Sequence, residues 1–188
     1  MTEQLRPSQL MQDLGVVQAD DAILARPARP FELPDERPAA EHTLDQLHEA
    51  LDRIATVHDF SKGMGLAAPQ IGLPRAAAIV RPPTPGADPI ILLNPRIIFA
   101  SAETDEQYEG CLSFFDVRGL VPRSLRVTMQ HTGLDGCASR TGYDYALARL
   151  IAHEVDHLNG VLYTQRMRPN LTPIPLTQYR GTGQAWVY

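Results

Sequence analysis

The segment 143–158 constrains the fold most strongly, because it predicts a helix that must bury one of its faces. Gly160 stands just beyond it, where a glycine commonly ends a helix. The apolar residues that recur at helical spacing are Leu147, Leu150, Ile151 and Leu158. We therefore expect a helix from Tyr143 to Leu158.

The same helix carries two histidines one turn apart. His153 and His157 enclose an HExxH sequence, HEVDH, so both imidazoles share one helix face at a spacing suited to one metal ion. Glu154 follows the first histidine, where it can take a proton from an attacking water and pass it to a leaving group. The alternative is a surface helix with two chance histidines, and the independently predicted helix favours the metal site.

A hydrolytic metal usually keeps three protein ligands and one open position, so a third ligand is needed. Residues 160–188 contain no His, Asp, Glu or Cys, which disfavours a protease of the thermolysin kind and places the third ligand upstream. The candidates are both cysteines, the other histidines and the upstream carboxylates. We favour Cys111, which follows a Glu-Gly turn, over Cys137, which follows a polar glycine-rich turn and is expected to be an ordinary thiol.

The rest of the chain predicts strands, one further helix and extended ends. Residues 1–40 form an extended or helical N-terminal strap with a proline-rich stretch, and residues 168–188 form an extended tail. Between them we expect an amphipathic helix over 43–58, capped by Thr43. The small-residue segment 63–72 predicts a turn. Strands are expected at 76–80, 90–100 and 120–132, the last entering a hairpin.

Length and charge narrow the class of protein. A chain of 188 residues is long enough for one domain, taken here as 1–188. Its net charge of -5 argues against direct binding of nucleic acid. Neither a signal peptide nor an apolar run of membrane-spanning length is recognisable, so we expect a cytoplasmic protein with no membrane partner. Two cysteines provide no disulfide framework.

Three segments together resemble the signature motifs of the peptide deformylases, in order and with plausible spacing. They are GMGLAAPQIG (63–72), EGCLS (109–113) and HEVDHLNG (153–160). The resemblance extends through NPRI (94–97) and RGLVPR (118–123) to most of the chain between residues 24 and 167. It implies an α+β fold, a single domain in which antiparallel sheets surround the HExxH helix.

The resemblance also implies a site. Cys111, His153 and His157 would hold one divalent metal, and Glu154 would be the general acid and base. A thiolate ligand suits soft-to-borderline metals, so iron(II) is expected in the cell, and zinc, nickel or cobalt would also be accepted. Oxidation of the metal or the thiolate is the expected weakness.

Two donors are implied for the formyl oxygen, namely the side-chain amide of Gln70 and the backbone N–H of Leu112. Both would stabilise the oxyanion of the tetrahedral intermediate. Gly65 is expected to let an extended peptide backbone approach closely, because it has no Cβ. For Gly63 and Gly72, a tight turn with positive φ is at least an equal interpretation.

The implied activity is removal of the N-formyl group from N-formylmethionyl peptides of newly made proteins, with release of formate. The formylated nascent peptide is the expected partner, together with a transient ribosome association. One alternative is a specialised amidase of the same fold acting on another formylated compound. Another is an inactive metal-containing protein that binds extended peptides, which would need neither Glu154 nor Gln70.

The sequence departs from the family pattern at positions that touch no ligand. Ala152 stands where many relatives have Gln, and Phe114-Phe115-Asp116 follow Ser113. These changes favour a reshaped pocket for the first side chain of the substrate. The extended tail also replaces a helix found in some bacterial relatives, so a ribosome contact through such a helix has no support in this sequence.

Overall fold

The computed structural model describes residues 6–58, 60 and 63–181. Its helices are α1 (Pro7–Asp13), α2 (Arg37–Ala55), α3 (Tyr145–Leu158) and α4 (Leu176–Gly181). Its strands are β1 (Met64–Ala67), β2 (Ala77–Arg81), β3 (Ile90–Leu93), β4 (Arg96–Ala100), β5 (Thr104–Glu109), β6 (Val117–Ser124), β7 (Arg126–Thr132), β8 (Ala138–Asp144) and β9 (Ile174–Pro175). Short 3-10 turns are η1 (Ala22–Ala25), η2 (Ala68–Ile71), η3 (Leu112–Phe114) and η4 (Tyr163–Arg166).

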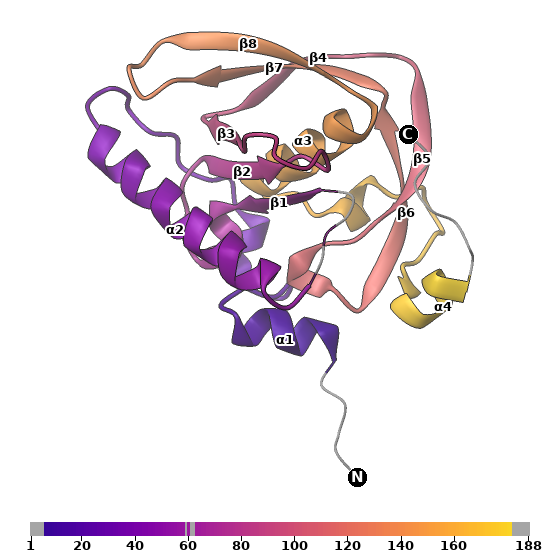
Figure 1. Cartoon of the computed structure of the whole chain (residues 1–188). Helices are drawn as coiled ribbons and strands as arrows, with labels where there is room; N and C mark the ends of the chain where they lie inside the picture. Colours follow the sequence, from indigo (N-terminus) through magenta and orange to yellow (C-terminus); the bar gives the residue numbers. More distant parts are fainter. Residues whose placement is uncertain (1–5, 59, 61–62, 182–188) are drawn as a thin grey trace.

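Helix α3, which carries the HEVDH sequence, lies at the centre of the molecule (Figure 1). The strands form three antiparallel sheets, with orders β1-β2-β3, β4-β7-β8 and β5-β6-β9. Helix α3 contacts strands of all three sheets. This arrangement confirms the predicted α+β class with antiparallel sheets around the HExxH helix.

The sheet β1-β2-β3 is covered by a helix on each face, which explains why β2 is apolar along most of its length. Leu47 and Leu51 of α2 belong to one core cluster with Ile79 of β2. Ile151 of α3 belongs to the other cluster, with Val80 of β2. Alternate residues of β2 thus face opposite helices, and the sheet holds α3 in a fixed position.

The first part of the proline-rich strap lies outside any helix and against the folded body, whereas its last two residues, Arg37 and Pro38, begin α2. Phe31 donates its N–H to Asn94 Oδ1 at 2.8 Å, and Asn94 Nδ2 donates back to the Phe31 carbonyl at 2.9 Å. Ala28 donates to the carbonyl of Leu158 at 2.8 Å, at the end of α3. These contacts tie the N-terminal segment to the element that carries the site.

The predicted start of the first long helix is wrong. Helix α2 begins at Arg37 rather than Thr43, with Pro38 in its first turn, a position that proline tolerates because the first N–H groups of a helix have no partner in any case. Thr43 therefore lies inside the helix, where its hydroxyl donates to the Ala39 carbonyl at 2.8 Å instead of capping. The helix also ends at Ala55, three residues earlier than expected.

Two predicted strands are each divided in two, and the predicted turn at 63–72 is mostly β1 and η2. Asn94, in the left-handed region with φ of 49°, separates β3 from β4, and Leu125 separates β6 from β7. The apolar pattern does not reveal such breaks, because one or two residues between two strands change it very little. Gly63 and Gly72 do have positive φ, 82° and 80°, as the turn interpretation expected.

The prediction of a wholly extended tail is wrong for the residues that the structure describes. Strand β9 pairs with β6, and Leu176 donates to the Asp116 carbonyl at 2.8 Å, after which α4 begins. The tail pattern alone cannot reveal a strand of two residues, because β9 is defined by its partner. The predictions for residues 1–5 and 182–188 lie outside the described residues.

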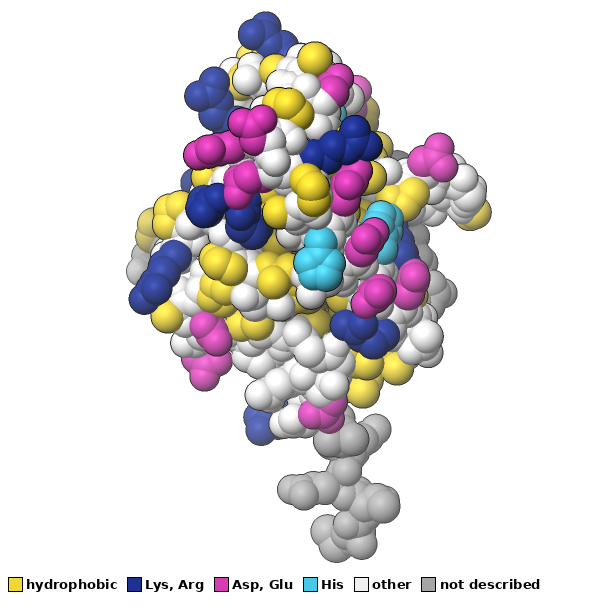
Figure 2. Space-filling model, turned by 90° about the vertical axis from the view of Figure 1, so that its left-hand side faces the viewer, with side chains coloured by type: hydrophobic (Ala, Val, Ile, Leu, Met, Phe, Trp, Pro, Cys, Tyr) yellow, Lys and Arg dark blue, Asp and Glu magenta, His cyan; other side chains and the backbone are white. Residues whose placement is uncertain are grey.

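On the face that α2 covers, basic and acidic side chains alternate rather than gather by sign (Figure 2). That distribution fits the modest net charge of -5, and the absence of direct nucleic-acid binding stays a prediction. Across the described residues, no helix combines the length and apolar character needed to cross a membrane.

Candidate metal centre

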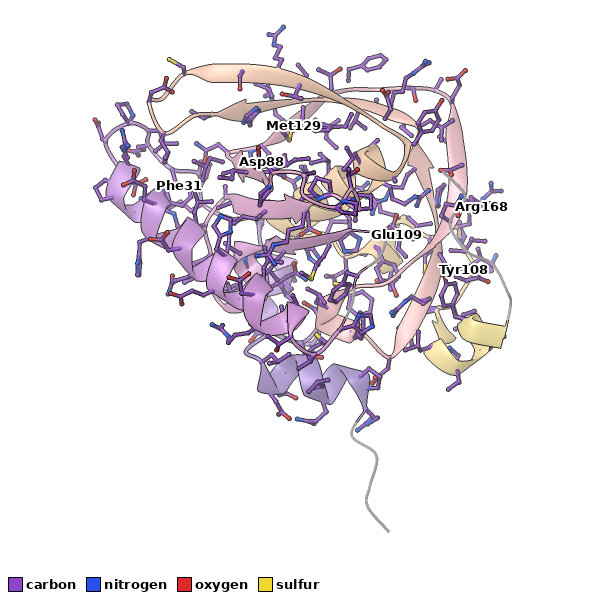
Figure 3. The ribbon with its side chains drawn as sticks, viewed as in Figure 1. Phe31, Asp88, Tyr108, Glu109, Met129 and Arg168 are labelled. Atoms are coloured by element: carbon purple, nitrogen blue, oxygen red, sulfur yellow. The ribbon has the colours of Figure 1, made fainter. Side chains whose placement is uncertain are left out.

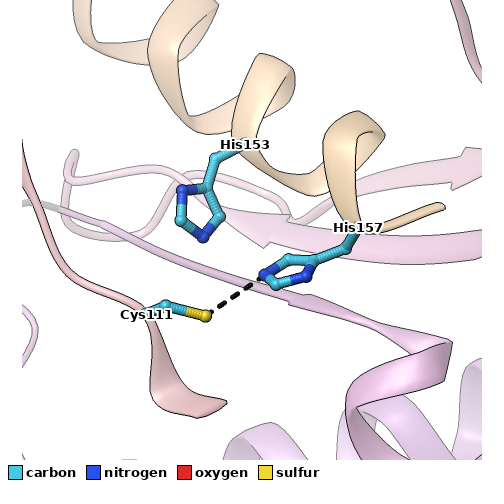
Figure 4. A group of neighbouring side chains, drawn as sticks. All are labelled: Cys111, His153 and His157. Carbon is cyan, nitrogen blue, oxygen red and sulfur yellow. Dashed lines mark hydrogen bonds between the residues drawn. The ribbon is translucent and has the colours of Figure 1, made fainter. Parts of the chain in front are cut away.

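The structure brings Cys111, His153 and His157 together around one point (Figure 4). One ligand atom from each residue lies within 4.8 Å of the other two, and all three side chains are buried. Cys111 Sγ lies 3.2 Å from His157 Nε2. The set of two imidazoles and one thiol fits a borderline divalent metal with an open position, which is the fit that the sequence predicted. Cys137 is exposed and does not belong to this group.

The orientation of His153 is set by Glu109, a residue for which the sequence indicated no role. The Nδ1 atom of His153 lies 3.0 Å from Glu109 Oε2, which leaves Nε2 to face the metal position. Carboxylates that hold the outer nitrogen of a ligating histidine fix its ring and its tautomer. Glu109 lies in the EGCLS motif, so its acidic character next to Cys111 was the only signal available.

Glu109 belongs to a buried ion network that α3 brings into the core. Arg123 donates to both Glu109 oxygens, at 2.9 and 3.0 Å, and to Asp156 at 2.6 Å. Arg149 donates to Glu109 at 2.6 Å and to Asp105 at 2.7 Å. Although burial raises the pKa of Glu109, hydrogen bonds from His153 and Arg123 outweigh burial and hold that pKa well below its usual range. Glu109 is therefore ionised beside the metal ligands.

Replacing Arg123 with Met should destabilise the protein by about 3 kcal/mol, because it leaves Glu109 and Asp156 buried with fewer partners. The free energy of unfolding in urea measures this, with metal content matched to wild type. Arg126→Ala is the control, since its 2.8 Å pair with Glu103 is more than half exposed and should contribute less than about 1 kcal/mol. Equal effects of the two substitutions would contradict a structural role for the buried network.

Glu154 points into the same site from α3 and lies over Gly65 of β1. A Cβ at Gly65 would come within 2.2 Å of Glu154 Oε1, so the missing side chain makes room for this carboxylate. Within the described part of the chain, Glu154 Oε2 is buried without a hydrogen-bond partner. Burial raises the pKa of Glu154 to about 7, against the charge of His153, which lowers it. A carboxylate with that pKa can both accept and return a proton near neutral pH.

Gln70 is held so that its donor end faces the site. Its Oε1 accepts the N–H of Ala67 at 2.9 Å, which directs Nε2 towards Cys111 Sγ at 3.5 Å and Ser113 Oγ at 3.3 Å. Leu112 opens the turn η3 directly after Cys111, and the first N–H groups of a helix have no partner within it. Gln70 and Leu112 both line the cavity described next.

A cavity of about 250 Å³ opens beside these groups and contains Cys111, His153, Glu154 and Gln70 among its lining residues. Other lining residues that sequence reasoning missed are His58, Phe60, Tyr108, Arg118, Arg149 and Tyr179. Of the two phenylalanines predicted to reshape the pocket, Phe115 lines the cavity. Phe114 instead stacks on Tyr163, with ring centroids 4.7 Å apart. No local pattern marks the missed residues, because they come from separate elements.

Comparisons with known proteins agree with this geometry. The sequence model of the polypeptide deformylase family matches residues 14–172. A peptide deformylase of Chloroflexus aggregans is 37% identical over 183 residues, covering 88% of this chain and 93% of that one. The Met-Ala-Ser-bound class I type b peptide deformylase of Acinetobacter baumannii matches with TM-score 0.70 and 32% identity, over 81% of this chain and 96% of that one. The peptide deformylase of Thermotoga maritima matches with TM-score 0.70 and 30% identity, over 82% and 97%.

Proposed function

This chain belongs to the peptide deformylase family, hydrolases that remove the N-formyl group from nascent peptides, and we propose how its own residues perform that reaction. The observation that carries the proposal is that Cys111, His153, Glu154 and Gln70 line one cavity, and that His157 clusters with the first two of them. A protein that only bound extended peptides would need neither the buried carboxylate of Glu154 nor the oriented amide of Gln70.

Cys111 Sγ and the ring nitrogens of His153 and His157 would hold the divalent metal, which supplies Lewis acidity and a water of lowered pKa when bound. Glu109 keeps the His153 ring in place through Nδ1. We propose iron(II) as the metal in the cell, with zinc, nickel or cobalt also accepted, because thiolate and imidazole donors suit all of them.

Glu154 acts as the general base and then as the general acid. Its carboxylate takes the proton of the attacking water and delivers it to the peptide nitrogen as the formyl carbon–nitrogen bond breaks, so formate and a free amine are released. The Gln70 amide and the Leu112 N–H donate to the formyl oxygen as negative charge develops on it. Gly65 leaves the space that the Glu154 carboxylate occupies, and we propose that the backbone of β1 beside it pairs with the extended substrate.

The test of this proposal is formate release from formyl-Met-Ala-Ser by protein purified without oxygen and loaded with iron(II) or nickel(II). Fast release that disappears in Glu154→Ala supports the assignment. Release from another formylated compound, but not from this peptide, would favour the specialised amidase. Metal-loaded protein that releases no formate from any formylated substrate would favour the inactive binder.

Gln70→Ala should lower kcat by about 100-fold, because it removes one preorganised donor to the developing oxyanion. The metal content should not change, since Gln70 is not a ligand, and KM should change little because the donor acts mainly in the transition state. Steady-state kinetics with metal analysis measures both. A rise in KM at constant kcat would instead assign Gln70 to substrate binding.

The remaining expectations concern where the enzyme works. We propose the cytoplasm, where nascent chains are made and where a reducing environment keeps the Cys111 thiol available as a ligand. The transient association with the ribosome stays a prediction. The division of the chain into one domain with two terminal segments also stays a prediction.

A further inference from the structure

The C-terminal segment contributes a side chain to the catalytic cavity. Tyr179 of α4 lines the cavity together with Tyr108 of β5, and their ring centroids lie 5.3 Å apart. Figure 3 shows Tyr108 pointing towards α4 from the strand that leads into Glu109. A residue of the edge strand β5 and a residue of α4, which follows the other edge strand β9, thus both line the cavity.

The position of α4 is set by backbone pairing rather than by its own short length. Val117 and Arg118 of β6 pair with Pro175 and Ile174 of β9, and the Leu176 N–H donates to the Asp116 carbonyl at 2.8 Å. Strand β6 also pairs with β5 through its residues 119–124. One strand therefore holds both β5 and the start of α4, and so positions both tyrosines.

Two elements connect this part of the cavity lining to the reacting atoms, namely α3 and β5. Leu150 and Arg149 line the cavity too, three and four residues before His153 on α3, so they share its helix face one turn away. Tyr108 immediately precedes Glu109, which contacts His153. Phe115 and Phe60 also line the cavity, and their ring centroids lie 6.0 Å apart.

The chemistry of the substrate limits where in the cavity its first side chain can lie. Only the peptide nitrogen separates the formyl carbon from the first Cα, so the first side chain must enter the cavity within a few bonds of Glu154 and His153. Leu150 lies one turn before His153, and Tyr108, which contacts Tyr179, lies one residue before Glu109, so these lining residues are candidates for that contact. Tyrosine rings and an aliphatic floor suit a long, unbranched thioether, because sulfur packs well against aromatic rings.

We propose that Tyr179 is a specificity-determining residue, which closes the pocket for the first side chain of the formylated peptide and limits its size. The proposal rests on the function assigned above and adds to it a role for the C-terminal segment. The proposal predicts that selectivity for the first residue of the substrate depends on α4, although none of the proposed metal ligands and catalytic residues lies on that helix.

The test compares formyl-Met-Ala-Ser with formyl-Phe-Ala-Ser as substrates of full-length, metal-loaded protein. Tyr179→Ala should raise KM for the methionine peptide by about tenfold, the size of effect expected for lost pocket contacts, with kcat nearly unchanged. The ratio of kcat/KM values should shift towards the phenylalanine peptide. Tyr179→Phe should retain the wild-type ratio, because it keeps the ring.

Matched variants distinguish the loss of pocket contacts from a loss of stability in α4. Gln178→Ala changes an exposed neighbour on the same helix and should leave the ratio unchanged. Tyr108→Ala combined with Tyr179→Ala should shift the ratio less than the sum of the two single effects, since both residues form one wall. A shift in Phe115→Ala but not in Tyr179→Ala would overturn the inference and place the first side chain against Phe115. Inactive wild-type protein would instead refute the function itself.

Discussion

Glu154→Ala is expected to lower the rate of formate release by about 10²- to 10⁴-fold, the range typical of a positioned general acid and base. The physical reason is the environment of the carboxylate: it is buried beside Gly65, and burial raises its pKa to about 7. The measurement is single-turnover formate release at saturating substrate.

Metal content decides how that loss is interpreted. The Glu154 carboxylate is not among the clustered ligand atoms, so Glu154→Ala and the nearly isosteric Glu154→Gln should both retain metal at the wild-type ratio. If metal analysis finds the Glu154 variants empty, the residue is a ligand and the assigned proton transfer is wrong. Retained metal with retained turnover would also reject that role.

The second large effect is the loss of metal expected from substitution of Cys111, for which Cys137 provides an internal control. Cys111→Ala should weaken metal binding by more than about 100-fold, beyond the effect typical of a residue that only supports a ligand, and formate release should disappear with the metal. Cys137→Ala should change neither property, because Cys137 is exposed on the hairpin between β7 and β8.

Metal titration of the two variants under anaerobic conditions measures this difference. Cys111 is 3% exposed and its sulfur lies 3.2 Å from His157 Nε2, so its loss removes a donor from the centre of the site. Loss of metal from Cys137→Ala with normal metal binding in Cys111→Ala would show that Cys137, rather than Cys111, is the third metal ligand. Circular dichroism of the metal-free proteins should match wild type, which separates metal loss from unfolding.

Much of the fold and site could be predicted from the sequence, because helix periodicity and ligand chemistry depend only on residues that are close together in the chain. The helix period of 143–158 places His153 and His157 on one face whatever surrounds them. The absence of ligand types after residue 160 limits the third ligand to the upstream chain. Predicted boundaries failed where a single residue turns the chain, as Asn94 does, or where a pairing partner defines the element, as for β9.

The sequence by itself determined the helix that carries the histidines, the ligand types and the approximate positions of several strands, since each follows from periodicity or residue chemistry. Only the tertiary structure decided which side chains share the cavity. Glu109 meets His153 across 44 residues, Gly65 makes room for Glu154, and Tyr179 reaches Tyr108 from the far end of the chain. The physical reason is that these contacts depend on strand register and sheet order, which are set by packing over the whole molecule rather than by any local pattern.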